Sequence, residues 1–434
     1  WLHLIANKTI MLYPNCSFLE SPKYLAASDL ICLIQDRGSH ISQYQLPAKL
    51  IDALAMAIPV IACDVPPLRP FGDEGIIEII PNEQDLTPAI IRIFDNYEFY
   101  KKRSQNIREK HFLNNHSYNF GRKTILKLID NQVENEFNDE FRSLLNFLNF
   151  KFYKDSRKNS LDPNKINIVM FWKQNDTGLY GRRQEMLKKY LSKNKNVSRI
   201  LHFDAPIEIQ KLLSKKNVTK NSIYYQDNFI YESTLQRING YQSNAKTTEY
   251  TFVYTKNENH PLATELSKKI EVDSLATKQD YLKFIKQKMA AAEIDESETI
   301  FWFNPVVNEF DDIMGVFSPA MVVADFIDDQ RQWHQGSNQY YNIEENYKNV
   351  LKLSDINLCN SNSVLQMIED FGFNAILVTN GYEVFDQEFL DKPRPEALKD
   401  IQTPIVGYVG NLDPKRLDIG LLESLVLKLP QYTF

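Results

Sequence analysis

The feature that most constrains this chain is a regular alternation of short β-rich runs with amphipathic helical runs. The clearest example begins at residues 166–172, INIVMFW, where a run that is apolar except at Asn167 is followed by a polar loop and a helical pattern. An apolar run of this length is typical of a strand that is buried on both faces of a parallel sheet. Strands that alternate with helices predict parallel sheets with crossover helices. We therefore expect an α/β protein with doubly wound parallel sheets.

Changes of pattern along the chain predict its domain boundaries. Residues 1–152 open with alternating strands and helices and end with helices alone. A charged, Ser- and Asn-rich stretch at 153–165 interrupts the apolar period and is the expected linker. The second alternation fills 166–400, and a new strand and helix begin in 401–434. The strands expected in these last two segments lie at 166–172, 199–204, 248–255, 299–305, 320–328, 355–360, 375–381 and 404–413.

Composition excludes several classes of protein. The 434 residues are enough for about three compact units, and a net charge of -6 gives no sign of a nucleic-acid partner. The four cysteines form no CxxC or Cys/His cluster, so neither a zinc site nor a disulfide framework is expected, and a reducing cytoplasm is the expected compartment. No run is long and apolar enough to span a bilayer, so attachment to a membrane, if present, is expected to be peripheral.

Several sequence motifs are absent. The chain contains no GxxxxGK[ST], GxGxxG, HExxH or GxSxG pattern, which removes the usual support for P-loop, dinucleotide, zincin and serine-hydrolase chemistry. No Asp-x-Asp follows a strand, so we expect no catalytic metal and no cofactor.

The first candidate binding loop is TGLYGRR, which follows the strand at 166–172. Gly178 and Gly181 allow a ligand to approach the backbone, Tyr180 lies between them, and Arg182 and Arg183 open a helix. An arginine pair at a helix N-terminus opposes the helix dipole, so a compensating anion is expected. The alternative is an ordinary tight turn with solvated arginines.

The second candidate loop joins the strand and helix near the end of the chain. Gly410 follows the strand, and Lys415 and Arg416 begin the helix, where a diphosphate could bind. The alternative is ordinary surface charge.

Two acidic positions are candidates for polar chemistry. Asp328 and Asp329 follow a buried strand, where they could act as a general base or bind sugar hydroxyls; alternatively, Asp329 caps the following turn. Asp52 lies on a largely apolar helix and could accept a ribose or hexose hydroxyl; alternatively, it lies on the exposed face beside Lys49.

Residues 24–68 resemble the carboxyl-terminal, donor-binding domain of GT-B glycosyltransferases. The resemblance rests on YLAASDLICLI at 24–34 and LPAKLIDALAMAIPVIACDVPPL at 46–68. The family's two glutamates, separated by seven residues, correspond here to Tyr44 and Asp52, and its glycine before Pro-Val corresponds to Ala57. The resemblance implies that Asp52 accepts donor ribose hydroxyls and that Tyr44 cannot replace the sugar-contacting carboxylate.

Residues 166–434 resemble the same fold from its beginning. INIVMFWKQNDTGLYGRR is similar to the first strand and loop of the acceptor-side domain, and ADFIDDQRQW is similar to a Tyr-Asp-x-x-Asp-Asp-Trp segment of bacterial polysaccharide transferases. PIVGYVGNLDPKRLDIGLL is similar to the start of the donor-side domain, which implies that Lys415 or Arg416 contacts the donor diphosphate.

The resemblance implies two Rossmann-like domains and a hexosyltransferase of bacterial surface-polysaccharide assembly. Such an enzyme transfers sugar from a nucleoside diphosphate sugar to a glycan or lipid-linked glycan acceptor, with retention and without metal, at a cleft between the domains. The alternatives are a non-catalytic glycan-binding or scaffold unit, and a nucleotide-sugar epimerase of the same fold.

The order of the resembling segments is itself unusual. It is that of a fragment of a tandem two-transferase polypeptide, and the first residue, Trp1, agrees with this expectation. The alternative is a circular permutation, in which 404–434 completes the sheet of residues 1–100.

Overall fold

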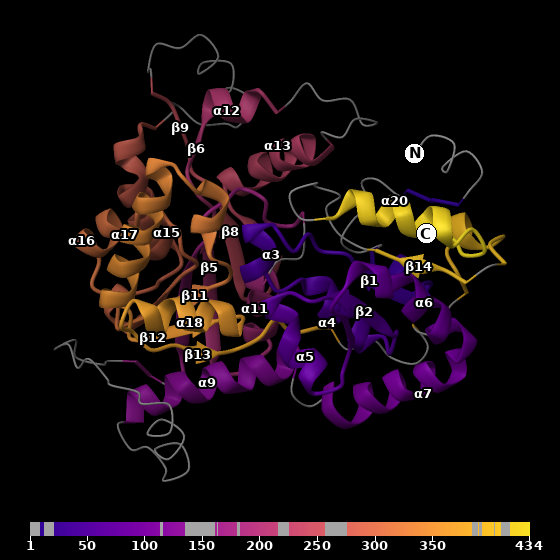
Figure 1. Cartoon of the computed structure of the whole chain (residues 1–434). Helices are drawn as coiled ribbons and strands as arrows, with labels where there is room; N and C mark the ends of the chain where they lie inside the picture. The colour runs from indigo at the N-terminus through magenta and orange to yellow at the C-terminus, as the bar shows by residue number, and fades with distance from the viewer. Residues whose placement is uncertain are drawn as a thin grey trace. The chain divides into compact units, whose positions relative to one another are not determined.

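The computed structural model describes most of the chain and divides it into two compact units (Figure 1). The described residues are 9–12, 21–112, 116–134, 161–162, 164–179, 183–215, 225–256, 276–383, 389, 393–402, 404–408 and 417–434. Unit 1 comprises Trp1–Gly121, Asn360–Gln366 and Val378–Phe434, and unit 2 comprises Arg122–Cys359 and Met367–Leu377. Two helices, α9 (Tyr118–Glu134) and α18 (Asn362–Asp370), contain residues of both units.

Unit 1 contains a parallel four-stranded sheet in the order β14-β1-β2-β3. Its strands are β1 (Leu30–Leu33), β2 (Val60–Cys63), β3 (Glu78–Ile80) and β14 (Val406–Gly407). Its helices are α2 (Ser21–Ala26), α3 (His40–Tyr44), α4 (Ala48–Ala55), α5 (Arg69–Asp73), α6 (Leu86–Asp95), α7 (Tyr97–Ile107) and α20 (Ile419–Lys428), and one turn of π-helix, η3 (Arg108–Phe112), follows α7.

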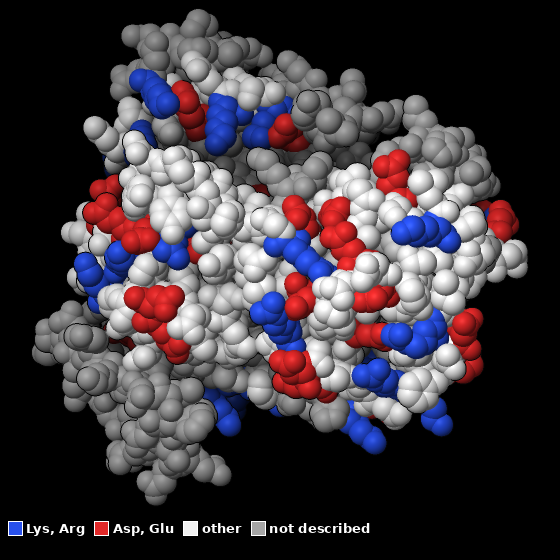
Figure 2. All heavy atoms as spheres, in the orientation of Figure 1, with Lys and Arg blue, Asp and Glu red and all other residues white. Residues whose placement is uncertain are grey.

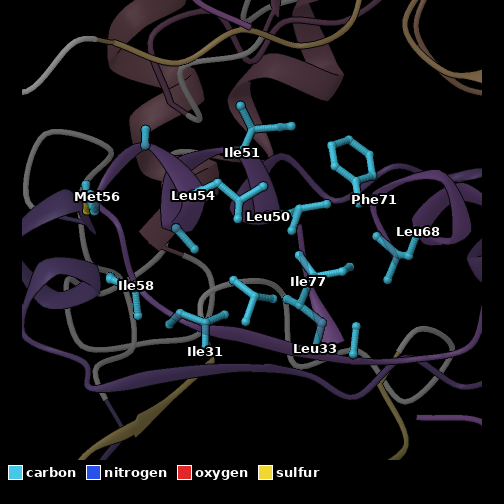
Figure 3. Packing of buried hydrophobic residues seen from close by; sticks show 14 of the residues in the cluster. Ile31, Leu33, Leu50, Ile51, Leu54, Met56, Ile58, Leu68, Phe71 and Ile77 are labelled. Atoms are coloured by element: carbon cyan, nitrogen blue, oxygen red, sulfur yellow. The ribbon is translucent and has the colours of Figure 1, made fainter. Parts of the chain in front are cut away.

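Alternate side chains of β1 enter different hydrophobic clusters on the two faces of the unit 1 sheet. Ile31 and Leu33 pack with residues of α4 and α5 (Figure 3), whereas Leu30 and Cys32 pack with residues of α6 and α20. Successive side chains of a strand point to opposite faces. Helices on both faces therefore explain why β1 is apolar at every position.

Unit 2 is built on an eight-stranded sheet in the order β13-β12-β11-β10-β4-β5-β8-β7. The pairs are parallel except for the β7–β8 hairpin. Its strands are β4 (Ile166–Phe171), β5 (Val197–Phe203), β7 (Tyr241–Asn244), β8 (Thr247–Tyr250), β10 (Thr299–Phe303), β11 (Met321–Phe326), β12 (Ile356–Cys359) and β13 (Ile376–Leu377). Its helices are α11 (Arg183–Leu191), α12 (Ile209–Leu213), α13 (Tyr225–Ile238), α15 (Tyr281–Ala291), α16 (Phe310–Val316) and α17 (Asn338–Leu353).

Aromatic side chains fill much of the unit 2 core. Phe171 of β4 stacks on Phe303 of β10 with ring centroids 4.7 Å apart, and Phe303 contacts Phe310 of α16 edge to face. Phe326 of β11 meets Tyr347 of α17 in the same manner. These contacts fix α16 and α17 against the middle strands through large buried rings.

The structure confirms the expected α/β class with parallel strands. The predicted strand at 166–172 is β4, but the region 248–255 is divided between two sheets. Its first half is β8, whereas β9 (Val253–Tyr254) pairs with β6 (Ile207–Glu208) in a separate two-stranded sheet. Between them the Thr251 N–H bonds to the carbonyl of Arg237 instead of continuing the larger sheet.

The predicted strand near the end of the chain lies beside β1. Val406 is in register with Leu30, and Gly407 with Ile31. The last residue, Phe434, exchanges backbone hydrogen bonds with the segment that contains Thr9 and Met11. This is the arrangement that the circularly permuted alternative describes.

Candidate functional site

The candidate site lies at the carboxyl edge of the unit 2 sheet, where β4 and β10 are neighbours. Numbered by their order in the chain, the six strands from β8 to β12 follow the spatial order 3-2-1-4-5-6, which is compatible with a Rossmann-like fold. The chain adds strands outward from β4 on one side and from β10 on the other. Ligands of open α/β sheets bind beyond the carboxyl ends of the strands at such a switch point.

Two hydrogen bonds, one within the loop and one to Ala205, hold the loop that follows β4. The Trp172 indole Nε1 donates to Asp176 Oδ1 over 2.8 Å, and the Ala205 N–H donates to the carbonyl of Gln174 over 3.2 Å. Gly178 has a φ of +91°, and a Cβ there would lie 3.3 Å from Nη2 of Arg237. Only glycine adopts this conformation readily. That a ligand approaches the backbone at Gly178 stays a prediction.

Beneath this loop four buried polar side chains form one hydrogen-bonded cluster. Thr177 Oγ1 donates to Asp204 Oδ1 over 2.5 Å, and Thr251 Oγ1 donates to Asp204 Oδ2 over 3.0 Å. His202 Nε2 lies 3.0 Å from Asp204 Oδ1 and 3.2 Å from Thr177 Oγ1. Burial, with the nearby Lys188 charge, lowers the pKa of His202, so the imidazole is neutral at pH 7.

This cluster positions the loop and differs from a hydrolase triad. In a triad the hydroxyl and the carboxylate contact different nitrogens of the histidine. Here Thr177 and Asp204 share Nε2, and all three side chains are buried. The arrangement ties the loop after β4 to the end of β5.

A second buried group joins α11, α13 and β8 through charge. Glu249 accepts from Lys188 Nζ and from Arg237 Nε, each over 2.8 Å. Burial alone raises the pKa of Glu249, but Lys188, His202 and Arg237 outweigh it and hold the pKa well below its usual range. Glu249 is therefore ionised near neutral pH.

Arg183, at the first turn of α11, makes a buried ion pair with Asp325 of β11. Its Nε lies 3.0 Å and 2.9 Å from the two carboxylate oxygens. Sequence reasoning expected an anion to compensate the arginine pair at this helix N-terminus. The structure shows that for Arg183 a carboxylate of the protein itself takes this position.

Two amide side chains at the switch point have unused hydrogen-bonding capacity. Gln184 is fully buried, and neither its Nε2 nor its Oε1 bonds to any described residue. Asn304, the residue after β10, donates weakly from Nδ2 to the carbonyl of Phe171 over 3.4 Å, while its Oδ1 finds no partner in the described part of the chain. Buried amides are normally satisfied, so these atoms mark a place that suits ordered water or a polar ligand.

The structure does not describe the remaining three residues of the predicted loop. Tyr180, Gly181 and Arg182 lie outside the described residues. Among the described residues of this loop, Gly178 is exposed and donates its N–H to Glu185, and Lys173 is half-buried.

The carboxylate of Asp329 is buried and hydrogen-bonded to neighbouring side chains, and Asp328 is half-buried. Asp329 is fully buried and accepts from Arg331 and Gln332; its Oδ1 caps the short helix η6 (Gln330–His334) through the Arg331 N–H. The cap is the alternative that the sequence left open. The carbonyl of Asp328 accepts from the Tyr347 hydroxyl over 2.9 Å. A catalytic role for either aspartate stays a prediction.

In unit 1, Asp52 is a half-buried carboxylate on α4. Burial raises the pKa of Asp52 to about 6; Lys49 opposes the shift and Glu383 adds to it. Tyr44, also half-buried, ends α3. Gly410, Lys415 and Arg416 lie outside the described residues, and α20 begins at Ile419 with Asp418 as its cap.

Sequence reasoning missed a cation at the carboxyl edge of the unit 1 sheet. Arg37 follows β1 and donates from Nη2 to the carbonyl of Ile80 over 2.6 Å and from Nη1 to that of Pro81. It also lowers the pKa of Cys63, which burial, the larger influence, raises. The sequence signal was a basic residue and a glycine in the loop that follows a buried strand. Gln184 and Asn304 carried no comparable signal, because buried and exposed amides look alike in a sequence.

Within the described residues no group of three or more His, Cys, Asp or Glu side chains is placed to hold a metal ion. None of the helices described combines the length and apolarity needed to cross a bilayer.

Comparisons with known protein families, with curated proteins and with solved structures find no match for this chain.

Proposed function

We propose that this chain is a GT-B-type glycosyltransferase that moves a sugar from a nucleoside diphosphate sugar to a glycan in surface-polysaccharide assembly. The observation that carries the proposal is the pairing of β14 with β1 in unit 1. Both segments that resemble a donor domain, one from each end of the chain, thereby contribute to a single parallel sheet. A nucleotide site that needs loops from both segments can form in such a unit.

The proposed donor residues belong to unit 1. Asp52 accepts the ribose hydroxyls, with Lys49 beside it, and the loop containing Gly410, Lys415 and Arg416 binds the diphosphate. A backbone loop at a helix N-terminus and two cations stabilise the charge that develops on the leaving diphosphate, so the reaction needs no metal.

The proposed acceptor residues belong to unit 2. The loop from Gly178 to Arg182, together with Gln184 and Asn304, supplies hydrogen bonds to acceptor hydroxyls. In the transfer, the bond from the sugar C1 to the diphosphate oxygen breaks and a bond from C1 to an acceptor oxygen forms, with retention. The acceptor hydroxyl passes its proton to the oxygen of the departing diphosphate, and Asp328 orients that hydroxyl.

Ligand-dependent thermal stability tests the donor site. UDP, GDP and dTDP are each added to the full chain, because a ligand at 100 times its dissociation constant stabilises a protein by about 2.7 kcal/mol. We expect stabilisation by one nucleotide, with the shift reduced in Asp52→Asn. The matched control, Asp400→Asn, changes an exposed carboxylate of the same unit and should keep the full shift. If none of the three nucleotides raises the thermal stability of the chain, the proposal is contradicted.

A non-catalytic glycan-binding protein is the second candidate, and Tyr44 in place of a carboxylate favours it. The two functions are distinguished by incubating the chain with a sugar donor of the nucleotide that stabilises it and measuring whether free sugar is released. Slow hydrolysis indicates a transferase. Glycan binding without nucleotide binding or hydrolysis indicates a binding unit instead.

A further inference from the structure

The outer face of α7 and η3 combines an exposed aromatic ring with basic side chains. Phe99 has 66% of its surface exposed. It lines a shallow cavity of about 330 Å³ together with Lys102, Arg103, Asn106, Ile107 and Lys110. We call this set of six residues the α7 face. Phe99 and the half-buried Ile107 are the apolar members of this set, and the other four side chains are polar or basic.

The basic residues of this segment divide into two groups. Arg103 donates to the carbonyl of Gly75 over 2.6 Å, and Arg108 donates to that of Ala55 over 2.7 Å. These two arginines therefore attach the helix to the rest of unit 1. Lys102 and Lys110 are exposed, and neither makes an ion pair within the described residues. Their charges are available to a partner outside the chain.

The charge of the segment is positive. Residues 97–110 contain five basic side chains, Lys101, Lys102, Arg103, Arg108 and Lys110, against two acidic ones, Glu98 and Glu109. In Figure 2, basic side chains project along the lower right edge of the view, where Figure 1 places α7.

We propose that the α7 face docks unit 1 on an anionic lipid surface. A helix lying in the plane of a membrane inserts its apolar side chains at the headgroup boundary and keeps its lysines at the anionic headgroups. Aromatic rings favour this depth, and each basic residue near an anionic surface strengthens binding about fivefold. Phe99 supplies the ring, and Lys102 and Lys110 supply the charges. A single such face predicts reversible, salt-sensitive attachment.

Flotation with vesicles tests the proposal on the full chain. Vesicles of phosphatidylcholine containing phosphatidylglycerol are compared with vesicles of phosphatidylcholine alone. We expect binding to the anionic vesicles and its loss at high salt. Phe99→Ser should weaken the partition about tenfold, and Lys102→Glu with Lys110→Glu should weaken it by more than the fivefold per lysine expected for neutralisation.

Matched controls exist on two helices of unit 2. Tyr341, on α17, has 69% of its surface exposed but lies in an acidic sequence, and Tyr341→Ser should leave binding unchanged. Lys283→Glu with Lys286→Glu reverses two exposed charges of α15 and should also leave binding unchanged. Circular dichroism shows that each variant is folded.

Equal losses in the control variants would overturn the proposal, because net charge would then explain the binding. Equal binding to the two kinds of vesicle, or none to either, would overturn it as well. Nucleotide binding does not depend on this face, so the outcome is independent of the proposed transferase activity.

Discussion

Single residues show that a carboxylate's partners decide its role. Asp329 and Asp325 both lie near the carboxyl end of β11, and each is fully buried and engaged by an arginine. Asp52 has the opposite environment, because burial raises its pKa while only Lys49 opposes the shift. A carboxylate that is costly to ionise has the most to gain from a ligand hydroxyl.

At this scale we predict that Asp52→Asn stabilises unit 1 at alkaline pH. The pKa of Asp52 is raised from 3.8 to about 6 in the folded protein. A raised pKa means that the folded state binds the proton more tightly, so this group's stability is present below pH 4 and is lost as the pH rises through 6. Asparagine removes that loss, and we expect about 1 to 3 kcal/mol of stabilisation at pH 8 and little at pH 4.

Urea unfolding of wild type and variant at the two pH values measures this difference. Asp400→Asn, which changes an exposed carboxylate, serves as the control. A variant whose advantage does not depend on pH would show that the carboxyl of Asp52 is not perturbed.

At the scale of elements, polar side chains hold the helices of unit 2 to its sheet. Glu249 on β8 joins Lys188 of α11 to Arg237 of α13, and all three side chains are buried. Removing one partner of a buried ion pair strongly destabilises the folded protein, because the remaining charge is still excluded from water but is no longer paired. The packing of both helices thus depends on one carboxylate.

We predict that Glu249→Gln destabilises unit 2 by about 3 kcal/mol at pH 7. The pKa of Glu249 lies well below its ordinary 4.5, so its contribution is present above pH 4.5 and is lost as the pH falls toward the folded-state pKa. The difference between wild type and variant should therefore shrink in acid.

Tryptophan fluorescence follows this unfolding, because Trp172, Trp302 and Trp333 belong to unit 2. Glu298→Gln, at an exposed position, should have little effect. If the free energy of unfolding of the variant is below that of the wild type by the same amount at neutral and acid pH, the ionised carboxylate is not the cause of the difference.

At the scale of the molecule, unit 1 is assembled from segments far apart in the chain. Gly407 of β14 lies so close to β1 that a Cβ there would meet the Ser28 side chain and Cδ1 of Ile31 at less than 3 Å. The two ends of the chain therefore share one core, and a substitution that disturbs packing at one end should destabilise the other.

We predict that Gly407→Val destabilises unit 1 by about 1–3 kcal/mol through overpacking. Hydrogen exchange should rise in peptides covering β1 and β2, while those covering β4 and β10 keep their protection. Gly315→Ala is the control, since nothing lies within 4 Å of its added Cβ. Unchanged exchange in β1 would show that β14 does not pair with it in solution.

Local patterns in the sequence determined the class of this protein. Apolar runs such as 168–171 predict buried strands because every side chain of such a strand must leave water, and glycine at position 178 predicts close approach to the backbone because glycine has no side chain. Both properties belong to a residue and its neighbours in the chain.

Only the tertiary structure decided which strands pair and which charges meet. The place of β14 beside β1, the partner of Arg183 and the contact of Asn304 with Phe171 depend on residues more than a hundred positions away. Hydrophobic periodicity shows that a strand is buried but does not specify its neighbour. Pairing and burial of charge follow from the packing of whole elements, because the free energy of each contact depends on everything else that excludes water from it.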